Sequence, residues 1–128
     1  MRLLLDTHVL IWWLNDDAAL SVTARQAIAD PGSEVFVSAA NAWEIAIKRA
    51  LGKLEFPIDR ISKILDEAGF APLGIEVQHT IRAGALPRHH DDPFDRMLIA
   101  QAQLEGLVIA TADSTFRKYD VSLIDGAD

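Results

Sequence analysis

The chain has 128 residues, of which 50% are hydrophobic and 24% charged, and its net charge is −7. This composition excludes intrinsic disorder, and the absence of cysteine excludes disulfide frameworks, thiolate zinc sites and cysteine nucleophiles. The longest apolar run, residues 9–14, is far shorter than the ~20 residues of a membrane helix. We expect a soluble, cytoplasmic protein, without a membrane-bound part, whose residues 1–128 form one domain.

Short apolar runs alternate with helical segments along the chain. The best-defined helix covers residues 93–105, because Asp92 is a good N-cap, Pro93 suits the first helical position and Gly106 follows the end. In chain order, the pattern predicts a strand at 2–5, helices at 8–15 and 21–30, a strand at 34–38, helices at 41–51 and 59–68, a strand at 71–75, helices at 76–83 and 93–105, a strand at 107–110, a helical turn at 114–118 and a strand at 121–124.

Several of these strands are continuous apolar runs and do not alternate between apolar and polar residues. This pattern is typical of parallel strands that are buried on both faces, so we expect an α/β fold with helices on both faces of a parallel sheet. Ligands bind to such sheets beyond the carboxyl ends of the strands.

Four carboxylates are expected at that edge. Asp6 and Asp113 follow strands, and Glu44 and Asp95 lie in the first turns of helices. Each has a purely structural interpretation, as an N-cap, a partner of the helix dipole or an ion pair with Lys48. Together they repel, at a cost of roughly 4 kcal/mol for a pair about 4 Å apart at an effective dielectric constant of about 20. A hard divalent cation such as Mg²⁺ or Mn²⁺ would remove this cost.

Three stretches of the sequence resemble the PIN-domain ribonucleases, and within them the VapC-type toxins of bacterial toxin–antitoxin pairs. They are Leu3-Leu4-Leu5-Asp6-Thr7-His8 with Trp12, then Val37-Ser38-Ala39 through Trp43-Glu44-Ile45 and Lys48 to Gly52-Lys53-Leu54, and finally Asp92-Pro93-Phe94-Asp95-Arg96 with Leu98-Ile99-Ala100-Gln101-Ala102 and Thr111-Ala112-Asp113. The order and spacing match over nearly the whole chain.

The resemblance implies a three-layer α/β/α sandwich with about five parallel strands, and Mg²⁺-dependent endonucleolytic cleavage of RNA. Asp6, Glu44, Asp95 and Asp113 fall on the family's acidic positions, and we expect them to bind one or two Mg²⁺ ions that activate water and stabilise an in-line displacement. Candidates for hydrogen bonds to substrate or water are Thr7, Thr111 and Ser114. The resemblance also implies a homodimer and a cognate antitoxin protein that keeps the enzyme silent.

Aromatic and histidine residues outside the acidic set have simpler interpretations. Residues 89–92, His-His-Asp-Asp, look like a metal-binding cluster, but adjacent side chains diverge on an extended loop, which favours a polar loop capped by Asp92. Trp12 and Trp13 belong to a helix that is apolar all round, so they are either buried by neighbouring helices or form an interface.

Basic residues give no decisive signal. Arg88, Arg96, Arg117 and Lys118 either surround the acidic edge and contact RNA phosphates or are solvated charges. Two other functions remain open on the residues alone. A haloacid-dehalogenase-type phosphatase would have a second Asp where His8 stands, and a Mg²⁺-binding receiver-like or interaction domain without nuclease activity would not need Glu44.

Overall fold

A five-stranded parallel sheet forms the centre of the protein, as seen in a computed structural model that describes residues 1–128. The strand order is β3-β2-β1-β4-β5, and the register places Leu4 of β1 beside Phe36 of β2 and Ile109 of β4. The sheet confirms the predicted fold class. The strands are β1 (Arg2–Leu5), β2 (Glu34–Ser38), β3 (Ala71–Leu73), β4 (Val108–Thr111) and β5 (Ser122–Asp125).

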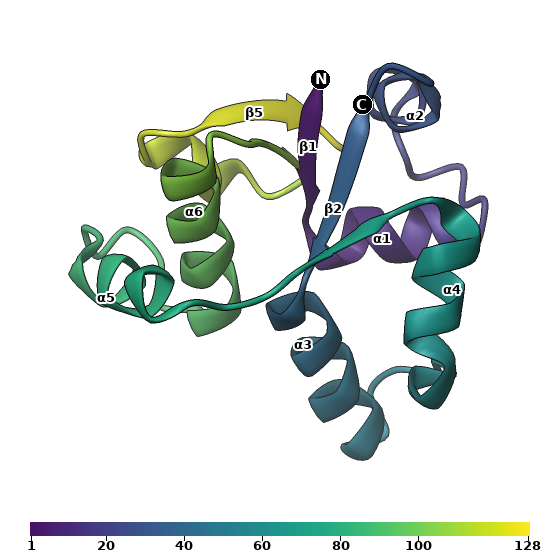
Figure 1. The fold of residues 1–128 in the computed structure, drawn as a ribbon, viewed down its shortest axis with the longest axis horizontal. Helices are drawn as coiled ribbons and strands as arrows, with labels where there is room; N and C mark the ends of the chain where they lie inside the picture. Colours follow the sequence, from purple (N-terminus) through teal and green to yellow (C-terminus); the bar gives the residue numbers. More distant parts are fainter.

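Helices cover both faces of the sheet (Figure 1). Helices α1, α2 and α4 pack on one face, and α6, with α5 beside it, packs on the other. The helices are α1 (Thr7–Leu14), α2 (Val22–Ala29), α3 (Ala39–Ala50), α4 (Ile61–Ala68), α5 (Val77–Ala85) and α6 (Pro93–Glu105), with 3₁₀ turns η1 (Ile58–Arg60) and η2 (Ser114–Lys118).

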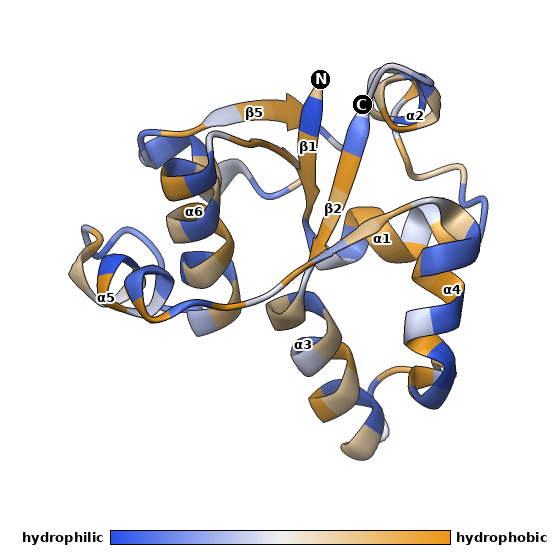
Figure 2. Cartoon of the chain, viewed as in Figure 1, coloured by the Kyte–Doolittle hydropathy of each residue, from blue (hydrophilic) through white to orange (hydrophobic).

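Alternation along β1 divides the core between the two faces. Leu3 and Leu5 belong to the cluster under α1, α2 and α4, whereas Leu4 belongs to the cluster under α6. All three side chains are fully buried, which stabilises the fold by roughly 1.5–3 kcal/mol each. The strands are accordingly among the most hydrophobic parts of the ribbon (Figure 2).

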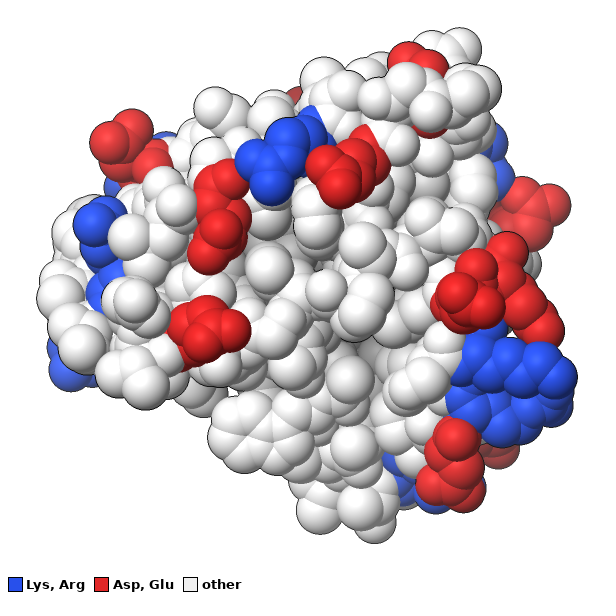
Figure 3. Space-filling model, in the orientation of Figure 1, with Lys and Arg blue, Asp and Glu red and all other residues white.

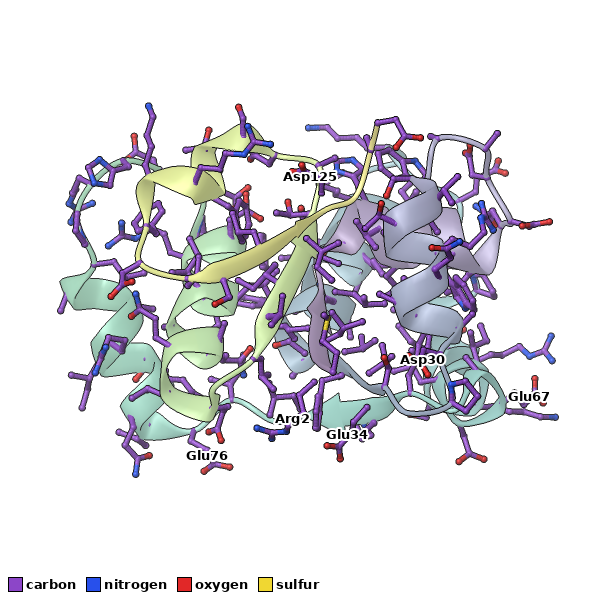
Figure 4. All side chains as sticks on the ribbon, turned by 90° about the horizontal axis from the view of Figure 1, so that it is seen from above. Arg2, Asp30, Glu34, Glu67, Glu76 and Asp125 are labelled. Carbon is purple, nitrogen blue, oxygen red and sulfur yellow. The ribbon has the colours of Figure 1, made fainter.

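The amino-terminal ends of α1, α3 and α6 meet near the carboxyl end of β1 (Figure 1). Each start has a side-chain cap: Asp6 accepts from the Thr7 N–H, Ser38 from the Ala40 N–H, and Asp92 from the Phe94 and Asp95 N–H groups. Arg2 and Glu34 lie at the opposite, amino-terminal edge, where they form an exposed ion pair at 3.4 Å (Figure 4).

The predicted elements all exist, but several bounds move. Helix α3 begins at Ala39, before the predicted position 41, because Ser38 and Asn41 form a capping box. Strand β3 ends at Leu73, and both β4 and β5 begin and end one residue later than predicted. None of the helices combines the length and the apolarity that a membrane span needs.

Candidate metal centre

A pocket of about 390 Å³ opens at the carboxyl ends of the strands. All four of the predicted carboxylates line this pocket, although they come from four separate segments of the chain. The residues that surround it are almost all polar or charged: Asp6, Thr7, His8, Glu44, Lys48, His90, Asp92, Asp95, Ala112 and Asp113.

Asp6 is held by two donors. Its Oδ1 accepts from the Thr7 N–H at 2.8 Å, and its Oδ2 accepts from the Thr111 hydroxyl at 2.7 Å. Burial raises the pKa of Asp6, and these two hydrogen bonds oppose the rise. The carboxylate is therefore fixed in one orientation in a place that disfavours its charge.

Glu44 has a similar pair of partners. Its Oε1 accepts from the Thr7 hydroxyl at 2.6 Å, and its Oε2 forms an ion pair with Lys48 Nζ at 2.7 Å. Asn41 donates to the Thr7 hydroxyl oxygen at 2.9 Å, so Thr7 can direct its own proton to Glu44. The hydrogen bond to Glu44 raises the pKa of Lys48. The predicted ion pair is thus present, and it lies inside the pocket.

Asp95 is the most strongly perturbed group of the four. Burial, followed by the negative charges of Asp6, Asp92, Glu44 and Asp113, raises its pKa to about 8. The carboxylates around Asp95 are therefore close enough to disfavour a negative charge on it, even with Lys48 and His90 in the same pocket. A carboxyl group at this position needs either a proton or a cation.

Asp113 lies at the other side of the pocket. Its Oδ1 accepts from the Thr115 N–H at 2.9 Å, and its Oδ2 lies 3.2 Å from His90 Nε2. Burial acts to raise the pKa of Asp113, but the hydrogen bonds from Thr115 and His90 outweigh it and lower the pKa. The pKa values of Asp95 and Asp113 are therefore shifted in opposite directions.

This donor set fits a hard divalent cation. Carboxylate oxygens are the ligands that Mg²⁺ and Mn²⁺ prefer, and both ions keep several waters, for which the pocket has space. One ring nitrogen of His90 and one carboxylate oxygen each of Asp95 and Asp113 lie within 4.8 Å of one another, a group that does not include Asp6 or Glu44. The residues that would hold the ion are Asp6, Glu44, Asp95 and Asp113, with Thr7 and Thr111 as donors behind them.

The structure places the remaining candidates, and the expectation for Arg96 is wrong. Ser114 lines an adjoining pocket that shares Ala112 and Asp113 with the acidic one. Arg96 does not face the edge, because its guanidinium is buried and donates to backbone carbonyls, including that of Ala83 at 2.8 Å. Trp12 and Trp13 are partly buried against the core. Arg88, Arg117 and Lys118 are exposed.

Sequence reasoning also missed His90. The expected polar loop at residues 89–92 exists, but the His90 ring turns into the pocket and its Nε2 lies 2.8 Å from Asp95 Oδ2. His89 points elsewhere and packs edge-on against Tyr119. No local pattern distinguishes the two histidines, because the His90 ring contacts Asp113 and Phe116, which are distant in the sequence.

Figure 3 shows one face of the molecule, and this face carries no continuous basic area. Acidic and basic side chains lie there in separate small groups. Arg117, which borders the adjoining pocket, pairs with Asp125 at 2.7 Å. This face therefore offers no broad basic area that would attract a polyanion.

Comparison with known proteins agrees with the fold. The PIN domain model matches residues 3–122. Ribonuclease VapC22 of Mycobacterium tuberculosis is 31% identical over 118 residues, which cover 91% of this chain and 90% of that protein.

Solved structures show the same architecture. The VapBC2 complex of Rickettsia felis, bound to a promoter DNA fragment, superposes with a TM-score of 0.71 at 13% identity, covering 98% of this chain and 99% of that one. VapBC-1 of nontypeable Haemophilus influenzae gives a TM-score of 0.69 at 20% identity, with 98% of each chain covered. With the family model spanning nearly the whole sequence and the acidic pocket at the expected edge of the sheet, this chain belongs to the PIN-domain family and is of the VapC type.

Proposed function

We propose that the chain is a Mg²⁺-dependent endoribonuclease and the toxic component of a toxin–antitoxin pair. The observation that carries the proposal is the convergence of Asp6, Glu44, Asp95 and Asp113 on one pocket, where Asp95 has a pKa of about 8. Folding alone gains nothing from gathering these charges, whereas a site for a divalent cation requires them.

The four carboxylates hold the cation, with Mn²⁺ as an alternative to Mg²⁺. Bound there, the metal supplies an activated water and neutralises charge on a phosphodiester. Thr111 keeps Asp6 in its orientation, and Thr7 does the same for Glu44. Lys48, 40% exposed at the pocket wall, is a cation that a phosphate can approach.

RNA is the proposed substrate. The relative with 31% identity is named a ribonuclease. Arg88, in the loop between α5 and α6, and Lys118, in η2, are exposed, and we propose that they bind phosphates of the RNA on either side of the cleaved bond.

A cognate antitoxin is the proposed partner, since the similar solved structures include toxin–antitoxin complexes. Helix α3 carries exposed apolar side chains at a helical spacing, Trp43, Ile47 and Leu51, on the same helix as Glu44. An amphipathic segment of the partner can cover this stripe and reach the acidic pocket with a basic side chain.

We further propose that the chain acts as one domain, forms a homodimer and works in the cytoplasm.

Cleavage of single-stranded RNA tests the enzyme. The purified chain should cut RNA in Mg²⁺ and stop in EDTA, and Asp6→Asn should abolish cutting without loss of fold. Asp120→Asn is the matched control, because this exposed carboxylate lies outside the pocket. Cutting that survives both EDTA and Asp6→Asn would refute the proposed site.

Expression in bacteria tests the toxin. The chain expressed alone should arrest growth, and co-expression with the reading frame immediately upstream should relieve the arrest. Asp6→Asn, expressed to the same level, should be harmless. An active nuclease that is harmless when expressed alone would contradict the proposed role as a toxin.

A further inference from the structure

An imidazole ring enters the acidic pocket from the loop between α5 and α6. His90 Nε2 lies 2.8 Å from Asp95 Oδ2 and 3.2 Å from Asp113 Oδ2. Asp95 comes from the first turn of α6 and Asp113 from the turn after β4, so the ring joins two segments that are separate in the sequence.

The position of the ring proton follows from its other nitrogen. The Asp92 N–H donates to His90 Nδ1 at 3.1 Å. A backbone N–H can only donate, so Nδ1 must present a lone pair and the proton must reside on Nε2. The ring therefore directs an N–H group at the two carboxylates even when it is neutral, and its Nε2 has no free lone pair for a metal.

The loop that carries His90 is tightly anchored. The buried guanidinium of Arg96 donates to the carbonyls of Leu86 at 3.0 Å, Pro87 at 2.9 Å and His90 itself at 3.2 Å. The His90 ring also packs edge-on against Phe116, which is fully buried. Withdrawal of the ring from the pocket would break its packing on Phe116, and the anchored backbone keeps the ring at the pocket, so we expect it to stay when a cation binds.

We propose that His90 is a positioning residue of the metal centre, which fixes Asp95 and Asp113 through its Nε2–H and is not itself a ligand. This inference rests on the proposed metal site. A donor held in place by the backbone lowers the repulsion between the two carboxylates and sets the direction of their free lone pairs before the ion arrives. Groups that orient ligands in this way typically contribute 10- to 100-fold to metal affinity.

Nitrogen-15 NMR of the imidazole groups tests the tautomer directly, with no need for RNA. The full chain should show His90 with a protonated Nε2 and an unprotonated Nδ1, both in EDTA and with Mg²⁺. Loss of the Nε2 proton when Mg²⁺ or Mn²⁺ binds would overturn the proposal, because the nitrogen would then be a ligand.

Three variants test the role in binding, with Mn²⁺ affinity measured by electron paramagnetic resonance. His90→Ala should weaken Mn²⁺ binding by about 10-fold or more. His90→Gln, whose amide nitrogen can occupy the place of Nε2–H, should stay within about 3-fold of wild type. His89→Ala is the matched control, because that neighbouring ring packs on Tyr119 outside the pocket, and it should bind like wild type.

The outcomes separate this inference from the nuclease proposal. Equal Mn²⁺ affinity in all the variants and wild type would refute the role of His90, and so would a His90→Gln variant that binds as weakly as His90→Ala. A wild-type chain that binds Mn²⁺ and shows the expected order of affinities, but cuts no RNA, would refute the nuclease and support the role of His90. Thermal melting of each variant in EDTA identifies any variant that fails to fold. If His90→Ala does not fold, the Mn²⁺ affinity of His90→Gln tests the role of His90 instead.

Discussion

The buried carboxyl group of Asp95 should make the metal-free protein lose stability as the pH rises. Burial and the neighbouring charges raise the pKa of Asp95 to about 8. In the unfolded chain the group has a pKa of about 3.9, so between these values the folded protein holds a proton that the unfolded chain has released. The stability that comes from this proton is fully present below pH ~4 and is lost as the pH rises through about 8.

The magnitude follows from the size of the shift. About 4 pKa units correspond to at most about 6 kcal/mol of unfolding free energy, and the linkage relation gives a loss of about 3.5 kcal/mol between pH 5 and pH 8. The Asp95 side chain is only 13% exposed, so solvent screens it little. For a chain of this length, the loss corresponds to a fall in Tm on the order of 10 °C.

Unfolding by urea in EDTA, at several pH values between 5 and 8, measures this effect in wild type and in Asp95→Asn. The asparagine keeps an oxygen that can accept from His90 but carries no charge. The unfolding free energy of the variant, relative to that of wild type, should therefore rise by about 3 kcal/mol between pH 5 and pH 8. Addition of Mg²⁺ at about 100 times its Kd should restore about 2.7 kcal/mol to wild type and less to the variant. Parallel pH profiles for the two proteins would refute the reasoning.

Three further substitutions test the surroundings of the pocket. Thr111→Val removes the hydroxyl that donates to Asp6, and should weaken Mn²⁺ binding by about 10-fold or more, which calorimetry measures; unchanged binding would contradict the orienting role. Arg96→Met leaves several buried carbonyls without a donor and should cost about 3 kcal/mol or more in urea unfolding, against less than about 1 kcal/mol if the loop finds other partners. Gly126→Ala places a Cβ 2.6 Å from Val9 Cγ2 and should lower stability by about 1–3 kcal/mol; a variant as stable as wild type would show that the contact relaxes freely.

The sheet and its edge were predictable because their signals are local. Apolar runs at residues 2–5 and 34–38 define β1 and β2, and the cap and proline before α6 define its start. Once the strands are known to be parallel, the topology alone brings Asp6 and Asp113 to one edge. Asp95 follows from its place in the first turn of α6, and Glu44 from its place near the start of α3.

The rest of the site depends on contacts between distant residues. The His90 ring contacts Asp113 and Phe116, which are distant in the sequence. Arg96, which was expected at the acidic edge, is buried because its guanidinium donates to backbone carbonyls. The capping box of Ser38 and Asn41 starts α3 early and brings Asn41 to Thr7, a hydrogen bond that no local pattern predicts.

Anomalous scattering from crystals grown with Mn²⁺ tests the central claim most directly, because it locates the ion without reference to any substrate. The carboxylates of Asp6, Glu44, Asp95 and Asp113 should surround the strongest anomalous peak, and that peak should vanish in crystals of Asp6→Asn. A fully soaked crystal with no peak in this pocket, or with its only ordered manganese elsewhere on the chain, would contradict the assignment of the pocket as a metal centre.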